Sequence, residues 1–294
     1  MDTHVFLAQQ FEEERPRLRA VAYRMLGSLA EAEDAVQEVW LNLSRSDMST
    51  ISNLGGWLTT VVARVCLNML HARKSRGEQS LEASMADRVT GDKRGIDPEQ
   101  EMELADSVGL ALLVVLEQLA PAERIAFVLH DIFAVPFNEI APIVERSEAA
   151  TRQLASRARR RVRGRAQIQD ADLTAKREVV EAFLTAARGG SFEALLTVLD
   201  PDVMVRLDPR ALPEGVPAEL QGAAFVAKLV AERAHAFRAC QAVLVDGSVG
   251  IVVVPNGRLL AVLDLQIKGG KITAITGILD PAHLRQLHLA VLDD

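Results

Sequence analysis

The chain has 294 residues, a formal net charge of −7 and a hydrophobic fraction of 49%. This length suggests two or three domains, and the hydrophobic fraction excludes a globally disordered chain. Because the chain is acidic, any contact with nucleic acid has to come from a local basic patch. The two cysteines, Cys66 and Cys240, stand far apart, which excludes a disulfide framework and fits a reduced cytoplasmic setting.

The start of the chain and its apolar stretches give no sign of a membrane or of export. Residues 1–4 lack the basic and apolar pattern of a signal peptide. The longest apolar stretch, residues 108–116, is too short to span a bilayer. We therefore expect a soluble cytoplasmic protein with no membrane partner. No residue cluster suggests a metal site, and we expect no cofactor.

The pattern along the chain changes three times. Helical periodicity covers residues 1–76, and residues 77–98 have the Gly, Ser, Asp, Lys and Arg composition of a flexible linker. Helical periodicity returns over residues 99–167. After a short polar stretch, residues 172–294 combine helices with short strands. We therefore predict two all-α domains followed by an α+β domain.

The first informative helix begins at a capping box, with Ser28 at the cap and Glu31 reaching back to it. One face is apolar and the opposite face is acidic. An acidic face is often only a solvated surface. However, the segment Ala32–Trp40 resembles region 2 of bacterial RNA polymerase sigma factors. The resemblance implies that this face docks on the clamp coiled coil of the largest polymerase subunit, since an acidic face suits a basic partner. The predicted polymerase-binding residues are Glu31, Asp34, Gln37 and Glu38.

The next helix, Trp57–Arg76, carries an apolar stripe and a polar face at helical spacing. Cations at its end would by themselves suit the helix dipole. The segment Gly56–Arg64 resembles the promoter-melting helix of sigma factors. The resemblance implies binding to the −10 promoter element, with the loop Arg45–Gly55 receiving a flipped base. The predicted −10 residues are Asn53, Trp57, Thr60, Arg64, Asn68, His71, Arg73 and Lys74.

The segment that opens with Leu116–Arg124 resembles sigma region 4, which contains a helix-turn-helix. We predict its first helix at Phe137–Val144, a turn at Glu145–Ser147 and a recognition helix that Ser147 caps, from Glu148 to about Arg163. Leu154, Ala158 and Val162 are expected to face inward. The predicted −35 residues are Ser147, Thr151, Arg152, Gln153, Ser156, Arg157, Arg159, Arg160 and Arg163.

Charge supports this interpretation of the recognition helix. Residues 146–165 contain eight arginines and one acid, Glu148. Such a local excess in an acidic chain is typical of a surface that binds a phosphate backbone. An arginine-rich solvated helix end and a protein–protein surface are the alternatives. The turn departs from the motif, since Glu145 and Arg146 stand where glycine and an apolar residue are usual. The order of the features over residues 1–167 resembles an extracytoplasmic-function (ECF) sigma factor.

The last domain is predicted to be an antiparallel meander with helices packed on it. The expected helices are Ala175–Arg188, Phe192–Leu199 and Phe225–Phe237, and a polar tether at Gln167–Thr174 precedes them. The turns Asp246-Gly247, Asn256-Gly257 and Gly269-Gly270 suit tight hairpins. The expected strands are Ala242–Val245, Gly250–Val254, Leu259–Ile267 and Lys271–Leu279.

This domain resembles the SnoaL-like (nuclear transport factor 2-like) fold, a cone-shaped curved sheet closed by helices. The resemblance extends to the sigma-factor subgroup that carries such a domain, which implies a built-in regulator. Enzymes of this fold place an acid–base pair in the cone. A pocket for an unknown small ligand would use Asp202, Arg206, Asp208, His235 and Asp264.

The sequence therefore predicts a sigma factor that directs core RNA polymerase to promoter DNA and does no chemistry itself. One alternative is a stand-alone helix-turn-helix regulator with a ligand-binding C-terminal domain. Another is a SnoaL-like enzyme with an appended DNA-binding region. The acidic residues Asp34–Glu38 discriminate among these, because only a sigma factor needs a site for the polymerase clamp.

Overall fold

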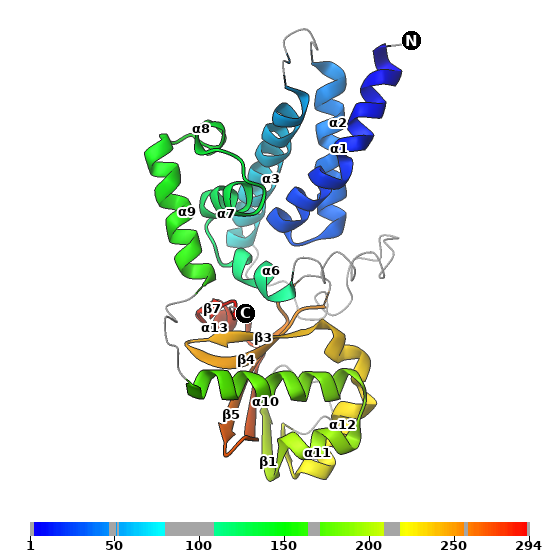
Figure 1. Cartoon of the computed structure of the whole chain (residues 1–294), viewed down its shortest axis with the longest axis vertical. Coiled ribbons are helices and arrows are strands. Elements are labelled where there is room, and N and C mark those ends of the chain that lie inside the picture. Colours follow the sequence, from blue (N-terminus) through cyan, green and yellow to red (C-terminus); the bar gives the residue numbers. More distant parts are fainter. Residues whose placement is uncertain are drawn as a thin grey trace. The chain divides into compact units, whose positions relative to one another are not determined.

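The computed structural model describes residues 3–46, 51, 53–79, 109–163, 171–208, 218–255 and 258–292. They form two compact units (Figure 1). The first unit contains helices α1–α3, α7, α8 and α9 as far as Arg160, and the second contains α6, the last two residues of α9 and all elements from α10 onward. Most of the predicted linker, residues 80–98, lies outside the described residues. Among the described residues, no helix is both long enough and apolar enough to cross a bilayer.

Three helices make the N-terminal part of the first unit: α1 (Thr3–Leu26), α2 (Leu29–Arg45) and α3 (Leu54–Gln79). Each packs against the other two. Their facing side chains, including Leu18, Val36 and Leu58, are at most 1% exposed. Helix α3 continues to Gln79, so its last three residues lie in the segment that the sequence predicted as linker.

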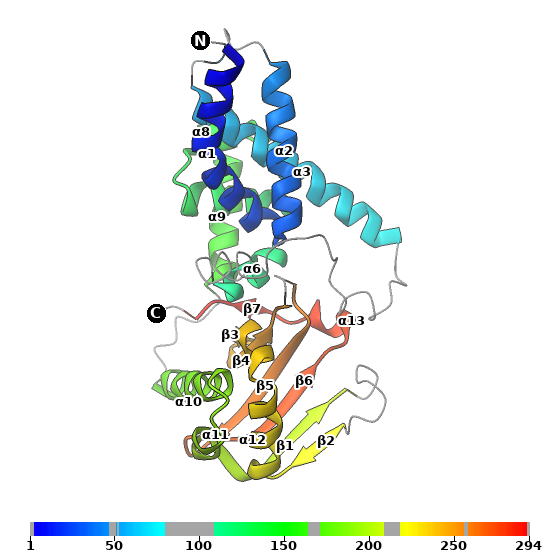
Figure 2. The same ribbon diagram turned by 90° about the vertical axis from the view of Figure 1, so that its right-hand side faces the viewer.

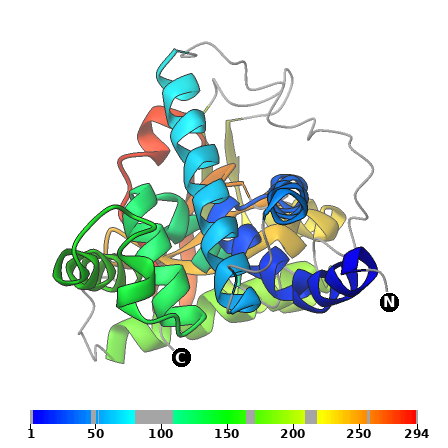
Figure 3. The same ribbon diagram turned by 90° about the horizontal axis from the view of Figure 1, so that it is seen from above.

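Four short elements complete the first unit: α7 (Pro121–Phe127), the π-helix η2 (Val128–Ile132), α8 (Phe137–Ile140) and α9 (Glu148–Val162). Helix α8 ends at Ile140, four residues before the predicted end, and the chain turns from there to α9. Helix α3 contacts α7, and α1 contacts η2. Figures 1 and 3 show α3 between α1 and α2 on one side and α7–α9 on the other.

The second unit is built on a seven-stranded sheet of order β2-β1-β6-β5-β4-β3-β7 (Figure 2). The predicted meander corresponds to β3 (Cys240–Val245), β4 (Ser248–Val253), β5 (Ala261–Lys268) and β6 (Lys271–Ile278), which pair antiparallel in that order. The meander is not the whole sheet, however. The turn at residues 256–257 lies outside the described residues.

Three strands were not predicted from the sequence. Strand β1 (Leu199–Leu207) runs parallel to β6 and antiparallel to β2 (Glu219–Gln221), and β7 (Leu289–Ala290) pairs with β3. The sheet is therefore larger than the predicted antiparallel meander, and its pairing of β1 with β6 is parallel. The run Asp200-Pro201-Asp202 looks like a turn because its residues favour turns, although Val203 and Val205 alternate as buried strand residues.

Helices cover one face of this sheet: α10 (Ala171–Arg188), α11 (Phe192–Val198) and α12 (Ala223–Glu232). Helix α12 ends at Glu232, and a 3-10 helix, η4 (Ala234–Ala239), replaces the end of the predicted helix. Helix α10 begins at Ala171, so the last four residues of the predicted tether are helical. Phe183, Leu184, Ile251 and Ile272, all at most 1% exposed, lie in the core between helices and sheet.

Helix α6 (Leu110–Glu117) contacts β3 and β7, so it packs with the C-terminal sheet. Gln241 Oε1 accepts a hydrogen bond from Ala111 N at 2.7 Å, which satisfies a first-turn amide that has no side-chain cap of its own. Gln118 Nε2 donates to Leu287 O at 3.0 Å, and Gln118 Oε1 accepts from Leu289 N at 3.3 Å. From the sequence, these residues were predicted in one domain, residues 99–167, with α7–α9, which pack mainly in the first unit.

Candidate nucleic-acid interface

The acidic face of α2 is positioned by a helix cap. Ser28 Oγ accepts from Glu31 N at 3.5 Å, and the apolar residues of α2 face inward. Asp34, Gln37 and Glu38 are exposed on the opposite face. Among the described residues, Asp34 and Glu38 have no basic partner. This face therefore presents unpaired negative charge to solvent, which suits a positively charged partner.

Two other acids of α2 are used within the unit. The capping box predicted that Glu31 reaches back to the cap. Instead, Glu31 forms an ion pair with Arg73 of α3. Glu33 pairs with Arg15 and Arg19 of α1, each at 3.4 Å. The predicted polymerase-binding residue Glu31 is therefore tied to the helix packing, unlike Asp34 and Glu38.

Leu41 lies one turn beyond Glu38 and is 38% exposed. Among the described residues, only Leu41 and Phe225 are exposed large hydrophobic side chains. A protein interface commonly has an apolar centre within a polar rim. Leu41 was not among the predicted interface residues, although its spacing of seven residues from Asp34 places it on the same helical face.

The polar face of α3 has the predicted spacing. Arg64, Asn68 and His71 are exposed, and Thr60 and Trp57 are half-buried. Thr60 Oγ1 donates to Gly56 O at 3.0 Å, so its hydroxyl proton is used within the helix. Arg64 has no acidic partner among the described residues. The face thus offers a cation, an amide and an imidazole in one line.

Asn53 begins α3. Its Oδ1 accepts from Gly56 N at 3.1 Å, and its backbone O accepts from Trp57 N at 3.0 Å. The side chain is exposed, so the Nδ2 amide remains available to a ligand while Oδ1 caps the helix. Residues 47–50 and 52 of the predicted base-receiving loop lie outside the described residues.

Arg73 has an internal role in the structure. It is half-buried, pairs with Glu31 and donates to Leu26 O at 3.2 Å. These contacts join α3 to the end of α1 and the start of α2. The side chain of Lys74 lies outside the described residues.

The recognition helix α9 begins as predicted, since Ser147 Oγ accepts from Ala150 N at 3.2 Å. Thr151 was predicted on the exposed face, which is wrong: it is 0% exposed and its hydroxyl donates to Ser147 O at 3.0 Å. The buried stripe consists of Thr151, Ala155, Ala158 and Val162. Leu154 is only half-buried.

The basic residues of α9 divide into two groups. Arg152 pairs with Glu148, and its guanidinium lies 5.7 Å from the ring centre of Phe137. Arg159 Nε lies 2.7 Å from Asp131 Oδ1 of η2. These two arginines fix the helix within the unit. The remaining predicted residues are exposed: Gln153, Ser156, Arg157, Arg160 and Arg163.

The C-terminal residues predicted for a pocket do not converge. A cavity of about 270 Å³ is lined by Arg206 and Asp208 of that set, together with Asp280 and His283. Asp202, His235 and Asp264 do not line it. Arg206 pairs with Glu219 at 3.4 Å on the surface, and Asp280 Oδ2 caps the short helix α13 (Pro281–Leu284) by accepting from His283 N. Nowhere in the described ranges do three His, Cys, Asp or Glu side chains form a group that could hold a metal.

Comparison with known families fits this geometry. The Sigma-70 region 2 family matches residues 10–76, which contain α2 and most of α3, and the Sigma-70, region 4 family matches residues 109–162, which contain α9.

Relatives match almost the whole chain. The probable ECF RNA polymerase sigma factor SigI of Mycobacterium tuberculosis is 33% identical over 287 residues, which is 98% of each chain. The ECF RNA polymerase sigma factor SigJ of the same organism is 34% identical over 92% of this chain and 91% of its own. The crystal structure of SigJ covers 94% of this chain and 97% of its own, with a TM-score of 0.44 and 31% identity. The family predicted from the sequence is thus confirmed, and the chain belongs to the extracytoplasmic-function RNA polymerase sigma factors.

Proposed function

We propose that the chain binds core RNA polymerase through the exposed face of α2 and directs it to promoters that α3 and α9 read. The observation that carries this proposal is that two exposed acids without a described basic partner, Asp34 and Glu38, lie beside the exposed Leu41. A helix-turn-helix regulator without polymerase contact has no need of such a face. The polar face of α3 and the free cations of α9 supply the two DNA-binding surfaces.

Each predicted DNA surface has a distinct task. Arg64, Asn68 and His71 would hold the melted strand at the −10 element. At the −35 element, Gln153 near the start of α9 would read base edges in the major groove, while Arg157 and Arg160 lie along phosphates. We infer that the chain acts in the cytoplasm and does no chemistry of its own.

The test is reconstitution. Purified full-length protein is mixed with core polymerase, the complex is isolated by size exclusion, and genomic DNA fragments that it transcribes are mapped by their transcript starts. We expect co-elution with core polymerase and starts at a fixed distance from two shared sequence elements. Binding to DNA without any association with core polymerase would instead favour the stand-alone regulator.

We also propose that the C-terminal domain regulates the DNA-binding part. Support comes from α6 and from the last residue of α9, both of which bond to the C-terminal sheet region. Gln241 of β3 bonds to the first turn of α6, and Gln118 at the other end of α6 bonds to the backbone at β7. Val291 N donates to Val162 O, in the last residue of α9, at 2.8 Å. Region 4 thereby shares its first helix with the fused domain, which provides a direct mechanical connection.

Full-length point variants test this regulatory role. Gln118→Ala and Gln241→Ala should alter promoter-dependent transcription in vitro at equal concentrations of folded protein. Gln286→Ala, at an exposed glutamine of the same unit, is the control. If all three variants transcribe like the wild type, this coupling through α6 does not regulate initiation.

A further inference from the structure

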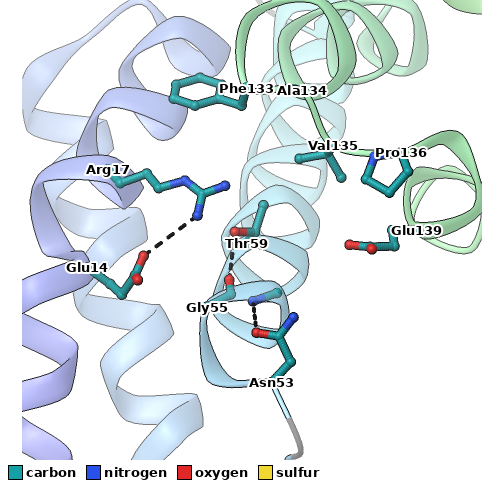
Figure 4. Close-up of a pocket in the computed structure, with 11 residues that line it drawn as sticks. Glu14, Arg17, Asn53, Gly55, Thr59, Phe133, Ala134, Val135, Pro136 and Glu139 are labelled. Atoms are coloured by element: carbon teal, nitrogen blue, oxygen red, sulfur yellow. Dashed lines mark hydrogen bonds and ion pairs between the residues drawn. The ribbon is translucent and has the colours of Figure 1, made fainter.

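An open cleft of about 350 Å³ lies within the first unit (Figure 4). It is lined by Glu14 and Arg17 of α1, residues of Asn53–Thr59 at the start of α3, the segment Phe133–Pro136 and Glu139 of α8. Small-molecule sites in proteins have volumes of about 300–1,000 Å³. The cleft is therefore at the lower end of this range, which suits a ligand of the size of a nucleoside.

Three polar side chains end in the cleft with hydrogen-bonding capacity to spare. The guanidinium of Arg17 is 3.9 Å from Glu14, beyond the range of a hydrogen bond, so its N–H donors remain available. Asn53 Oδ1 caps α3, but Asn53 Nδ2 has no partner among the described residues. The exposed carboxylate of Glu139 also has no described partner. Figure 4 shows these three polar ends facing one space in front of Thr59.

The walls between these groups are flat and largely apolar. Gly55 and Gly56 line the cleft without side chains. A Cβ atom at position 56 would lie 2.8 Å from Asn53 Nδ2, so the absence of a side chain there lets this amide lie over the start of the helix. On the region 4 side, Val135 and Pro136 provide apolar surface. A flat ring with polar edges fits between such walls.

The kinds of hydrogen-bonding group in the cleft discriminate between nucleobases. Arg17 can only donate hydrogen bonds, and the carboxylate of Glu139 can only accept them. Guanine has two acceptors, O6 and N7, on one edge and two donors, N1–H and the N2 amino group, on the next. Adenine has one donor and one acceptor on each of these edges, so each charged group would face one atom of the wrong kind. The donor and acceptor groups of the cleft therefore match guanine.

We propose that this cleft binds the base of a guanine nucleoside, free or phosphorylated. Arg17 donates to the acceptor edge, Glu139 accepts from the donor edge and Asn53 Nδ2 adds a donor for O6. Arg17 is the only cation among the described residues that line the cleft, so a phosphate group would remain in solvent. The inference goes beyond the proposed function, and binding can be tested without polymerase or promoter.

Isothermal titration calorimetry of the purified full-length protein measures the binding. Guanosine should bind with a dissociation constant on the order of tens of micromolar, as expected for a ligand of about 20 non-hydrogen atoms. GMP should bind within about two-fold of guanosine, because an exposed phosphate contributes little. Adenosine and cytidine should bind at least about ten-fold more weakly than guanosine, because their edges leave Arg17 or Glu139 facing the wrong kind of group.

Inosine, which differs from guanosine only in lacking the N2 amino group, tests the role of Glu139. The wild type should bind inosine about ten-fold more weakly than guanosine, because one carboxylate oxygen loses its donor. Glu139→Gln should bind both nucleosides weakly and without this preference, since its amide presents N–H groups toward the ligand's donors. A role of Glu139 in the fold alone would weaken both nucleosides equally and leave the preference intact.

Two further variants complete the design. Arg17→Gln should weaken guanosine and inosine by the same factor, because both nucleosides carry O6 and N7. Glu13→Gln is the matched control for Glu139→Gln, since Glu13 is an exposed acid of the same unit that does not line the cleft. It should bind guanosine as the wild type does. Circular dichroism checks the fold of each variant.

Three results would overturn the proposal. The first is equal affinity of the wild type for guanosine and adenosine. The second is a preference for guanosine over inosine that survives Glu139→Gln. The third is binding of guanine only within a short single-stranded thymine oligonucleotide that carries one guanine, since the cleft would then be part of the promoter-binding surface. A wild type that binds guanosine but no core polymerase would instead count against the proposed function.

Discussion

Glu31 and Arg73 form an ion pair that joins the first turn of α2 to α3. Both residues were predicted to bind a partner, Glu31 the polymerase and Arg73 the DNA. Their side chains are 30% and 40% exposed, and Arg73 also donates to Leu26 O. The pair therefore contributes to the packing of the three N-terminal helices, and a variant at Arg73 reports on the fold before it reports on DNA.

A comparison of two arginines on α3 separates these roles. Arg73→Gln should lower the free energy of unfolding by about 1 kcal/mol, because it breaks a partly exposed ion pair and a hydrogen bond. Arg64→Gln, at an exposed arginine with no described acidic partner, should change stability by less than about 0.5 kcal/mol. It should instead weaken −10 DNA binding and reduce the salt dependence by about one charge. Urea unfolding and holoenzyme binding at several salt concentrations measure the two effects. If Arg73→Gln and Arg64→Gln lowered the free energy of unfolding equally, the structural role of Arg73 would be contradicted.

Substitution of Asp34 and Glu38, the acids of α2 without a described basic partner, should impair polymerase binding and leave stability unchanged. The double variant Asp34→Lys with Glu38→Lys should retain the stability of the wild type, since exposed unpaired charges contribute little to folding. It should lose at least about ten-fold in affinity for core polymerase, because a like charge would face the basic partner. Competition with the wild type for core polymerase is the assay.

The matched control carries the same charge change elsewhere. Glu13→Lys with Glu193→Lys alters two exposed acids, one on α1 and one on α11. If the control loses as much affinity as the α2 variant, the effect reflects net charge, and the docking face is not on α2.

Local sequence patterns predicted much of this fold, but they did not predict contacts between residues far apart in the sequence. The caps at Ser28 and Ser147 and strands β3–β6 follow from signals within a few residues. The Glu31–Arg73 pair and the hydrogen bonds of Gln118 join residues 42 and about 170 positions apart, so only the tertiary structure determines them.

Thr151 illustrates a different limit. Leu154, Ala158 and Val162 were predicted to face inward and Thr151 outward. Ala158 and Val162 are buried as predicted, but Thr151 and Ala155 are buried as well, and Leu154 is only half-buried. Small side chains let a helix approach its neighbours closely, so the packing is determined by size as well as by hydrophobicity.

Three substitutions on α9 should have three different results. Gln153→Ala should reduce discrimination at one base pair of the upstream element by about 1–3 kcal/mol. Arg160→Ala should weaken binding to every sequence and flatten the salt dependence. Arg159→Ala should chiefly lower stability, since it breaks the ion pair with Asp131. Holoenzyme binding to wild-type and substituted upstream elements, with urea unfolding alongside, measures all three. Uniform losses from Gln153→Ala would show that it does not read a base.

The turn before α9 contains a residue with unfavourable backbone geometry. Glu145 has φ of +54°, in the left-handed region, and Arg146 N donates to Ala141 O at 3.1 Å to close the turn. A residue with a Cβ costs about 1–2 kcal/mol in this conformation, whereas glycine adopts it freely but loses more entropy on folding. Glu145→Gly should therefore raise the free energy of unfolding by about 0.5–1 kcal/mol, measured by urea unfolding of the full chain. Glu145→Ala keeps the strain and should bring no such gain. Glu148→Gly, the same substitution at the first residue of α9, should lower stability by up to about 1 kcal/mol, because it removes the ion pair with Arg152 and a favourable charge at the helix N-terminus. If glycine and alanine at position 145 have the same effect, backbone strain does not limit the stability of this turn.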